Sequence, residues 1–267
     1  MRLLMRLLWI IAQVLLISRA SAADLTRAEV QSMLSAAPAA EKANFAGRSL
    51  AGLDLADLDF SGADLSGVDL SGADLSGADL SGADLRGAKL VGAKLVGARL
   101  PNARLNLAWI IRADFSHADL SGADLETLIV STGLETLPAE AASFVGANLT
   151  GAKVMARLSL ADMRGANLSY LHASADMRNQ SMGLIRADFS RANLDAANFS
   201  GAALGHSNFE FAKLQHANFS GADLSDADFA GADLTEADLS DAKTAGANFA
   251  SAVLTSVRGL SSSDGKR

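Results

Sequence analysis

The sequence predicts an all-β protein, a solenoid in which the chain turns a corner once every five residues and stacks on itself. Large apolar residues recur every five positions from Phe45 to Leu125, in 17 units without a missed step, and again from Phe189 to Leu254, in 14 units. A small residue, usually alanine, lies two positions before each centre, as at Ala83. A period of five fits neither the 3.6 residues of a helical turn nor the 2.0 of a strand. Repetition this regular indicates a stacked repeat architecture with a narrow core.

These units resemble the pentapeptide-repeat family, whose pattern is A-(D/N)-L-x-x, over nearly all of Phe45 to Leu254. The resemblance implies a right-handed quadrilateral parallel β-helix with four repeats per coil, in which the centre and the preceding alanine point inward. Residues 20 positions apart would then stack at the strand spacing of about 4.8 Å. Phenylalanines alternate with leucines every ten residues from Phe189 to Phe229, so opposite walls would carry aromatic stacks.

The first 22 residues are predicted to be a signal peptide. Two arginines precede an uncharged apolar run from Leu7 to Ile17, and the A-S-A sequence ending at Ala22 offers the small residues that signal peptidases accept. This run is shorter than the ~20 residues that a membrane-spanning helix needs. Cleavage would remove three arginines and no acidic residue, and shift the formal net charge from −7 to −10. We expect an exported protein without membrane insertion after cleavage, in a Gram-negative periplasm, with a thylakoid lumen or the cell exterior as alternatives.

The sequence contains no cysteine. A lipid anchor at the cleavage site needs a cysteine, and a disulfide framework needs several. In an oxidising compartment the stability must therefore come from repetitive packing.

Residues 23–42 are predicted to form a short helix and a linker that cap the first coil. Thr26 to Glu29 has the capping-box pattern, and Val30, Met33 and Leu34 share one helical face. Pro38 limits the helix. A cap is expected because the open end of a stacked sheet templates aggregation.

The solenoid is expected to span residues 43–256, with a tail over 257–267. The tail shows no comparable helix, so this end is either self-capped or the place where two molecules meet, as a homodimer or a filament. The five-residue phase breaks near 131–143 and again near 178–186, with a four-residue step between Val154 and Leu158. We expect the breaks to leave the rod as loops.

The first break is the candidate partner-contact loop. It contains Leu134, Glu135, Leu137 and Pro138, whose apolar members cannot all enter the coil once the phase is lost. Grouped exposed apolar residues on a loop indicate an interaction site. The alternative is that the loop folds back and covers a weak coil around Val130.

One coil carries basic outward residues where its neighbours carry acidic ones. The candidate surface charge ring comprises Lys89, Lys94, Arg99, Arg104 and Trp109. The stacked positions 20 before it are Asp69, Asp74, Asp79 and Asp84, and 20 after it lie Trp109, Asp114, Asp119 and Asp124. An unbroken aspartate ladder would place like charges on neighbouring strands, which is unfavourable, and the change of sign relieves this. Trp109 is placed for a cation–π contact with Lys89. A dedicated anion-binding ring is the alternative.

No residues form a convincing catalytic set or metal site, and no cofactor is expected. Of the four histidines, His206 and His216 are ten positions apart, which puts them on opposite faces. The chain has no G-x-S-x-G, no H-x-H and no cysteine nucleophile. Its aspartates recur singly in outward columns instead of converging.

The function we expect is that of a non-enzymatic exported protein that binds or scaffolds a protein partner. One specific version is an inhibitor or immunity protein, because a rigid rod loses little entropy on binding. The resemblance implies an alternative, an acidic rod that mimics DNA and binds a topoisomerase such as gyrase, as some family members do. The basic ring and the predicted export weigh against it, and no direct binding of nucleic acid is expected. A structural surface or matrix protein is the third alternative.

Overall fold

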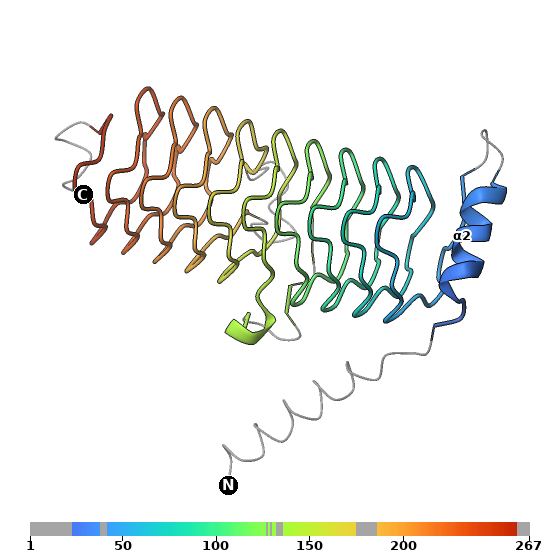
Figure 1. Ribbon diagram of the computed structural model, residues 1–267. Coiled ribbons are helices and arrows are strands. Elements are labelled where there is room, and N and C mark those ends of the chain that lie inside the picture. Colours follow the sequence, from blue (N-terminus) through green and yellow to red (C-terminus); the bar gives the residue numbers. More distant parts are fainter. Residues whose placement is uncertain are drawn as a thin grey trace, which may run out of the picture.

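A rod of stacked rectangular coils makes up most of the molecule (Figure 1). The structure is a computed structural model that describes residues 23–37, 42–126, 128, 130–131, 136–174 and 186–260. The predicted signal peptide and the last residues of the tail lie outside the described residues. The fold is a right-handed quadrilateral parallel β-helix, as the sequence predicts.

The walls of the rod are parallel ladders of single bridge residues. From Asn44↔Asp64 to Arg104↔Asp124, each bridge joins residues 20 positions apart, which confirms four repeats per coil. Each inward centre donates its N–H to the next coil, as Leu65 N does to Asp84 O at 2.8 Å. The residue before it bonds to the previous coil, as Asp64 N does to Ala43 O at 2.9 Å. These backbone groups are therefore satisfied between coils, while the N–H of the inward alanine closes the turn within its own coil, as Ala63 N does to Phe60 O at 2.9 Å.

The core is a narrow column of alanine and large apolar side chains. Ala83 and Leu85 are both 0% exposed, and the same holds for nearly every centre and preceding alanine in the regular blocks. The expected aromatic stacks are present on opposite walls: the rings of Phe209 and Phe229 stack at 4.8 Å, and those of Phe199 and Phe219 at 4.9 Å. Phe209 also meets Phe199 at 5.7 Å and Phe219 at 5.9 Å, edge to face across the core, so aromatic rings fill the interior there.

The corners are tight turns, and wherever the outward residue is an aspartate or asparagine its side chain closes the turn. Asp69 Oδ1, for example, accepts a hydrogen bond from Ser71 N at 3.0 Å. The next residue, Gly72, has φ +67°, in the left-handed region that glycine enters without strain. The D/N-L-x-G pattern thus provides what the turn requires, an acceptor side chain and a residue that adopts a positive φ.

Helix α2 (Arg27–Ala36) covers the first coil, opposite the C-terminal end (Figure 1). Its predicted capping box is confirmed: Thr26 N donates to Glu29 Oε2 at 2.7 Å, and Glu29 N donates to Thr26 Oγ1 at 3.3 Å. Val30 is fully buried and Met33 and Leu34 pack against the core, as expected. Pro38 lies outside the described residues.

Two insertions interrupt the register in the middle of the rod. Asp114 pairs with Ser143, 29 positions later, so nine residues are added to that coil between the buried Val130 and Phe144. They include the 3₁₀ helix η1 (Pro138–Glu140), which projects from the side of the rod (Figure 1). Asp162 pairs with Asn193, 31 positions later, and these 11 extra positions fall on residues 175–185, outside the described part.

The expected four-residue step lies between the insertions. Ser143 pairs with Asp162, only 19 positions later, while Val154 and Leu158 are both buried as core centres. One corner is therefore one residue shorter, and the parallel bridges continue on both sides of it.

The last described coil forms backbone bridges on one side only, with the coil before it. Lys243, Asn248, Val253 and Arg258 bridge to the coil before them, and no described residue pairs with them on the other side. Leu254 and Val257 are only partly buried there, and Val253 is 46% exposed.

Candidate functional site

The predicted charge ring forms four ion pairs, all directed toward the preceding coil. The cation–carboxylate distances are 3.9 Å for Lys89–Asp69, 3.8 Å for Lys94–Asp74, 3.1 Å for Arg99–Asp79 and 3.5 Å for Arg104–Asp84. The four basic side chains are 53–66% exposed, so each pair contributes on the order of 0–1 kcal/mol.

Two of the carboxylates on the following coil accept hydrogen bonds from asparagine side chains instead of pairing with the basic ring. Asp119 Oδ1 accepts from Asn148 Nδ2 at 2.9 Å, and Asp124 Oδ1 accepts from Asn106 Nδ2 at 2.7 Å. The ring is thus stacked between acidic coils, as expected, but its ion pairs are one-sided within the described residues.

The cation–π contact expected between Lys89 and Trp109 is not formed. The two residues are joined by a parallel bridge, yet the Lys89 ammonium lies beside Asp69 on the opposite side. The carboxylate offers the ammonium a full negative charge, which outweighs the ring quadrupole at an exposed site.

Hydroxyl donors lower the pKa of several outward aspartates. Asp223 Oδ1 accepts from Ser225 Oγ at 2.7 Å and from Ser225 N at 3.1 Å. These bonds, the side-chain one foremost, hold the pKa of Asp223 below its ordinary 3.8, with a smaller contribution from Lys243. Thr235 and Gln215 lower the pKa of Asp233 in the same way. The carboxylates are therefore built as ionised turn caps, which is a structural role.

The predicted contact loop is only partly described. Leu137 is 42% exposed and Pro138 is exposed, while Leu134 and Glu135 lie outside the described residues. Glu140 closes the turn behind them: its Oε2 accepts from Leu137 N at 3.2 Å, and its backbone oxygen accepts from Arg112 N at 2.9 Å. The loop is thus anchored to the coil beneath while Leu137 faces solvent.

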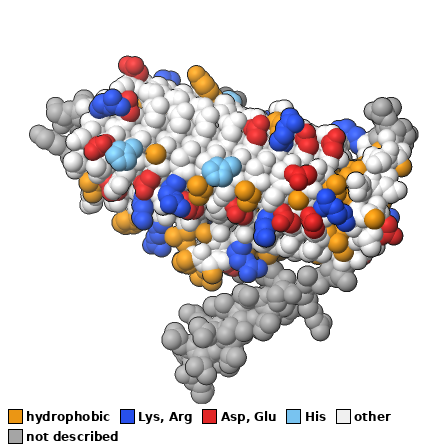
Figure 2. All heavy atoms as spheres, viewed as in Figure 1, with side chains coloured by type: hydrophobic (Ala, Val, Ile, Leu, Met, Phe, Trp, Pro, Cys, Tyr) orange, Lys and Arg blue, Asp and Glu red, His pale blue; other side chains and the backbone are white. Residues whose placement is uncertain are grey.

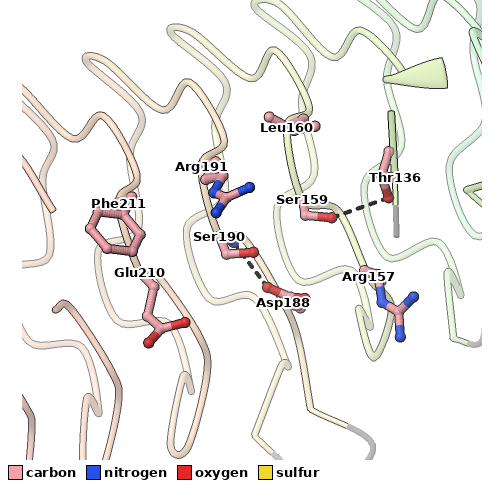
Figure 3. Close-up of a pocket in the computed structure, with 9 residues that line it drawn as sticks. All are labelled: Thr136, Arg157, Ser159, Leu160, Asp188, Ser190, Arg191, Glu210 and Phe211. Carbon is pink, nitrogen blue, oxygen red and sulfur yellow. Dashed lines mark hydrogen bonds between the residues drawn. The ribbon is translucent and has the colours of Figure 1, made fainter. Parts of the chain in front are cut away.

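Beside this loop lies a surface groove of about 320 Å³ that the sequence reasoning missed (Figure 3). Its walls come from three successive coils and from Thr136 at the base of the loop. It is lined by Thr136, Arg157, Ser159, Leu160, Asp188, Ser190, Arg191, Glu210 and Phe211. Ser159 Oγ donates to Thr136 Oγ1 at 3.1 Å, which ties the loop to the groove.

Corner residues form the outer edge of the groove. Some coils have glycine at this corner, as at Gly72 and Gly231, whereas three consecutive coils have Leu160, Arg191 and Phe211 there, at φ +65°, +57° and +55°. A bulky side chain in the left-handed region costs about 1 kcal/mol. Phe211 is nonetheless 59% exposed. The signal in the sequence was this loss of glycine at one corner in three coils running.

Two charged residues of the groove form no ion pair within the described part of the chain, namely Arg191 and Glu210. Asp188 accepts a hydrogen bond from Ser190 N at 3.0 Å. On the face that Figure 2 shows, acidic and basic side chains are interspersed.

No cluster of metal ligands occurs among the described residues. His206 Nε2 lies 3.9 Å from Asp226, and His216 Nδ1 lies 3.2 Å from Glu236, so each histidine stacks singly on an acidic residue of the next coil. Nor does any helix in the described ranges combine the length and apolarity needed to cross a bilayer.

The rod is built of charged repeats, with one capped end and an anchored loop, and its described residues include no convergent catalytic groups. These are the features of a solenoid of the pentapeptide type. The family model for pentapeptide repeats matches 8 copies, over residues 41–77, 69–106, 88–126, 184–210, 204–241 and 232–258. These ranges cover more than half of the chain, and the protein belongs to the pentapeptide repeat family.

Solved pentapeptide repeat proteins resemble the chain. HetL from the cyanobacterium Nostoc sp. strain PCC 7120, which is involved in heterocyst differentiation regulation, is 28% identical, with 87% of this chain and 96% of that one covered and a TM-score of 0.39. A pentapeptide repeat protein of the Arabidopsis thaliana thylakoid lumen is 29% identical over 46% and 67%, with a TM-score of 0.21. QnrB1, a plasmid-mediated fluoroquinolone resistance protein, is 19% identical over 82% and 86%, with a TM-score of 0.37. No curated protein sequence matches the chain.

Proposed function

We propose that this protein is a non-enzymatic exported binding protein, which holds a protein partner against the side of the rod where the nine-residue insertion projects. The observation that carries the proposal is the anchored loop with Leu137 42% exposed. Glu140 fixes both ends of the turn beneath it, so the apolar side chain is presented in one geometry. A preorganised contact loses little conformational entropy on binding, which suits an inhibitor or immunity protein.

Export and cleavage after Ala22 are part of the proposal. They are supported by the apolar run from Leu7 to Ile17 and by the small residues after it. A periplasmic site is the version we favour for the mature protein.

The DNA-mimic alternative is supported by the formal net charge of −7, but not by the pattern of the surface. Lys89, Lys94, Arg99 and Arg104 interrupt the carboxylate columns and pair with four of them. A mimic of the phosphate backbone needs an unbroken negative field.

Contact between two copies through the last described coil is the second interaction that we propose. Its partly buried Leu254 and Val257 and the exposed Val253 would gain apolar burial there.

The test of the loop is a deletion that restores the register. Removing 132–140 takes out the nine extra residues and joins Ser131 to Ala141, so that Val130 and Phe144 become consecutive core centres. Ala141→Gly supplies the glycine that the new corner needs. We expect the melting temperature to stay within a few degrees, because a regular coil replaces the insertion, while capture of partners from periplasmic extract is lost.

The matched control is Leu137→Asp in the full-length loop, which keeps the chain length and removes the apolar contact. Capture by the deletion variant at the level of the unaltered protein would refute the loop as the contact. A large loss of stability with capture intact would make the loop a lid over the coil around Val130.

The cleavage is tested in the same preparation, because the intact mass of the exported protein shows whether residues 1–22 are absent.

A further inference from the structure

The groove beside the loop combines features that a rod held together by ion pairs does not need. Arg191 occupies a corner between Leu160 on one coil and Phe211 on the next, so its stacked neighbours are apolar (Figure 3). By contrast, Lys89, Lys94, Arg99, Arg104, Lys243 and Arg258 each lie within 3.9 Å of a carboxylate of the preceding coil. The Arg191 guanidinium is exposed and makes no ion pair among the described residues.

The backbone gains nothing from these three side chains. Glycine at the same corner, as at Gly72 and Gly231, has the same φ without the steric cost. The Phe211 ring lies against Gly231 and leaves 59% of the residue exposed, so it contributes little to the core. Non-glycine residues in the left-handed region occur at 17 positions of the described chain, so the strain alone does not mark a site. What distinguishes these three is that they lie side by side along a groove, with the Phe211 ring exposed to solvent.

We propose that this groove binds an extended segment of a partner protein in which an acidic side chain is flanked by apolar ones. The carboxylate would pair with Arg191, and the apolar side chains would cover Leu160 and Phe211. Arginine and aromatic residues dominate the binding energy of protein interfaces, since they combine apolar area with directional bonds. The inference rests on the proposed function and deepens it, because Thr136 at the base of the contact loop forms one wall of the groove.

The residues of the groove away from its corner edge make the expected ligand more specific. Glu210 and Asp188 lie beneath that edge, where they favour a basic group on the inner side of the bound segment. The hydroxyls of Ser159 and Ser190 and the ring of Phe211 complete a lining in which a few polar groups fix orientation. The groove therefore fits a segment of mixed charge, and a purely anionic one would meet two carboxylates.

The probe is a display library of random twelve-residue peptides, selected against the purified protein. We expect enriched peptides to carry an acidic residue beside apolar ones. With Arg191→Glu the preference should reverse to a basic residue, because charge complementarity at that position changes sign. With Phe211→Gly the binding should weaken at least tenfold, while the melting temperature does not fall, since glycine suits a φ of +55°.

Arg112→Glu is the matched control. Arg112 lies on the same corner ladder with φ +57° but does not line the groove, so this variant should select the same peptides as the unaltered protein. Three results would overturn the proposal: no enrichment of peptides, an acidic preference that survives Arg191→Glu, or an equal loss with Arg112→Glu. A change in oligomeric state with Phe211→Gly would assign the groove to a second copy of the chain and equally overturn it.

The two proposals can fail separately. Partner capture that persists in Arg191→Glu and Phe211→Gly but disappears with the loop deletion leaves the loop contact standing and removes the groove. The reverse outcome combines two results: the selected peptides change with Arg191→Glu, and the loop deletion still captures partners. It would leave the groove standing and remove the loop contact.

Discussion

At the residue scale, the side chain of an outward aspartate or asparagine closes the turn in the repeats that carry one. The oxygen of its side chain takes the N–H two positions on, as Asp114 does from Ser116 at 3.0 Å and Asn198 from Ser200 at 3.1 Å. Only a short side chain with an acceptor oxygen reaches this N–H. The residue pattern therefore predicts the corners, but it does not predict toward which neighbouring coil each long basic side chain points, because that depends on the groups that both neighbouring coils offer.

The pKa shifts at these turns predict an acid-sensitive fold. The pKa of Asp223 is lowered from its ordinary 3.8, chiefly by the Ser225 hydroxyl, so the folded state holds the proton less tightly than the unfolded chain. This stabilisation is complete above the ordinary pKa and is lost as the pH falls through the lower pKa of the folded state. We expect the midpoint of chemical unfolding to drop as the pH falls below about 4.

Ser225→Ala tests the cause. It should cost about 0.5–1 kcal/mol at pH 7, less than a buried hydrogen bond to a charged group contributes, because the Asp223 side chain is 40% exposed and solvent screens its charge. The cost should shrink as the pH falls, once Asp223 is protonated. Ser220→Ala is the control, since its turn is closed by Asn218, which does not titrate. Equal pH dependence in both variants would contradict the assignment.

At the element scale, the coil is the unit that sequence could predict. The five-residue period predicts the corners, the resemblance to pentapeptide repeats implies the 20-position register and the inward face, and the capping box at Thr26 predicts the start of α2. These are all local patterns. The groove at Arg191 needs three coils and an insertion brought side by side, which depends on register changes of nine and 11 residues. The pattern shows where the phase breaks, but not which corner the breaks leave exposed.

Lys94→Glu tests the stacking of the charge ring. Its carboxylate would lie between Asp74 and Asp114, which bridge to this position on either side, and the ion pair of 3.8 Å would be lost. We expect a loss of about 1 kcal/mol at low salt, most of it recovered at 1 M salt, where charges are screened over about 3 Å. Lys94→Gln removes the ion pair without adding repulsion and should cost less. A loss that does not change with salt would point to packing instead of charge.

At the scale of the whole molecule, the two ends of the rod differ. Helix α2 covers one end with Val30 fully buried, while the last described coil leaves Val253 46% exposed. If two copies meet there, Val253→Lys should convert a dimer into a monomer in sedimentation at micromolar concentration, because burying an unpaired charge is costly. Ala28→Lys, on the exposed side of α2, is the control and should leave the mass unchanged. A monomer before any substitution would remove the homodimer.

The short step between Val154 and Leu158, with an insertion before and after it, has a consequence for cooperativity. In a stacked repeat, each coil is stabilised almost entirely by its two neighbours, so the stability of the array follows the weakest interface. The coils between the two regular blocks contain added residues, and closing a longer stretch of chain costs entropy. We therefore expect the rod to unfold as two cooperative blocks joined at this irregular region, where the proposed contact loop and groove both lie. A partner that clamps this region would couple the unfolding of one half of the protein to that of the other.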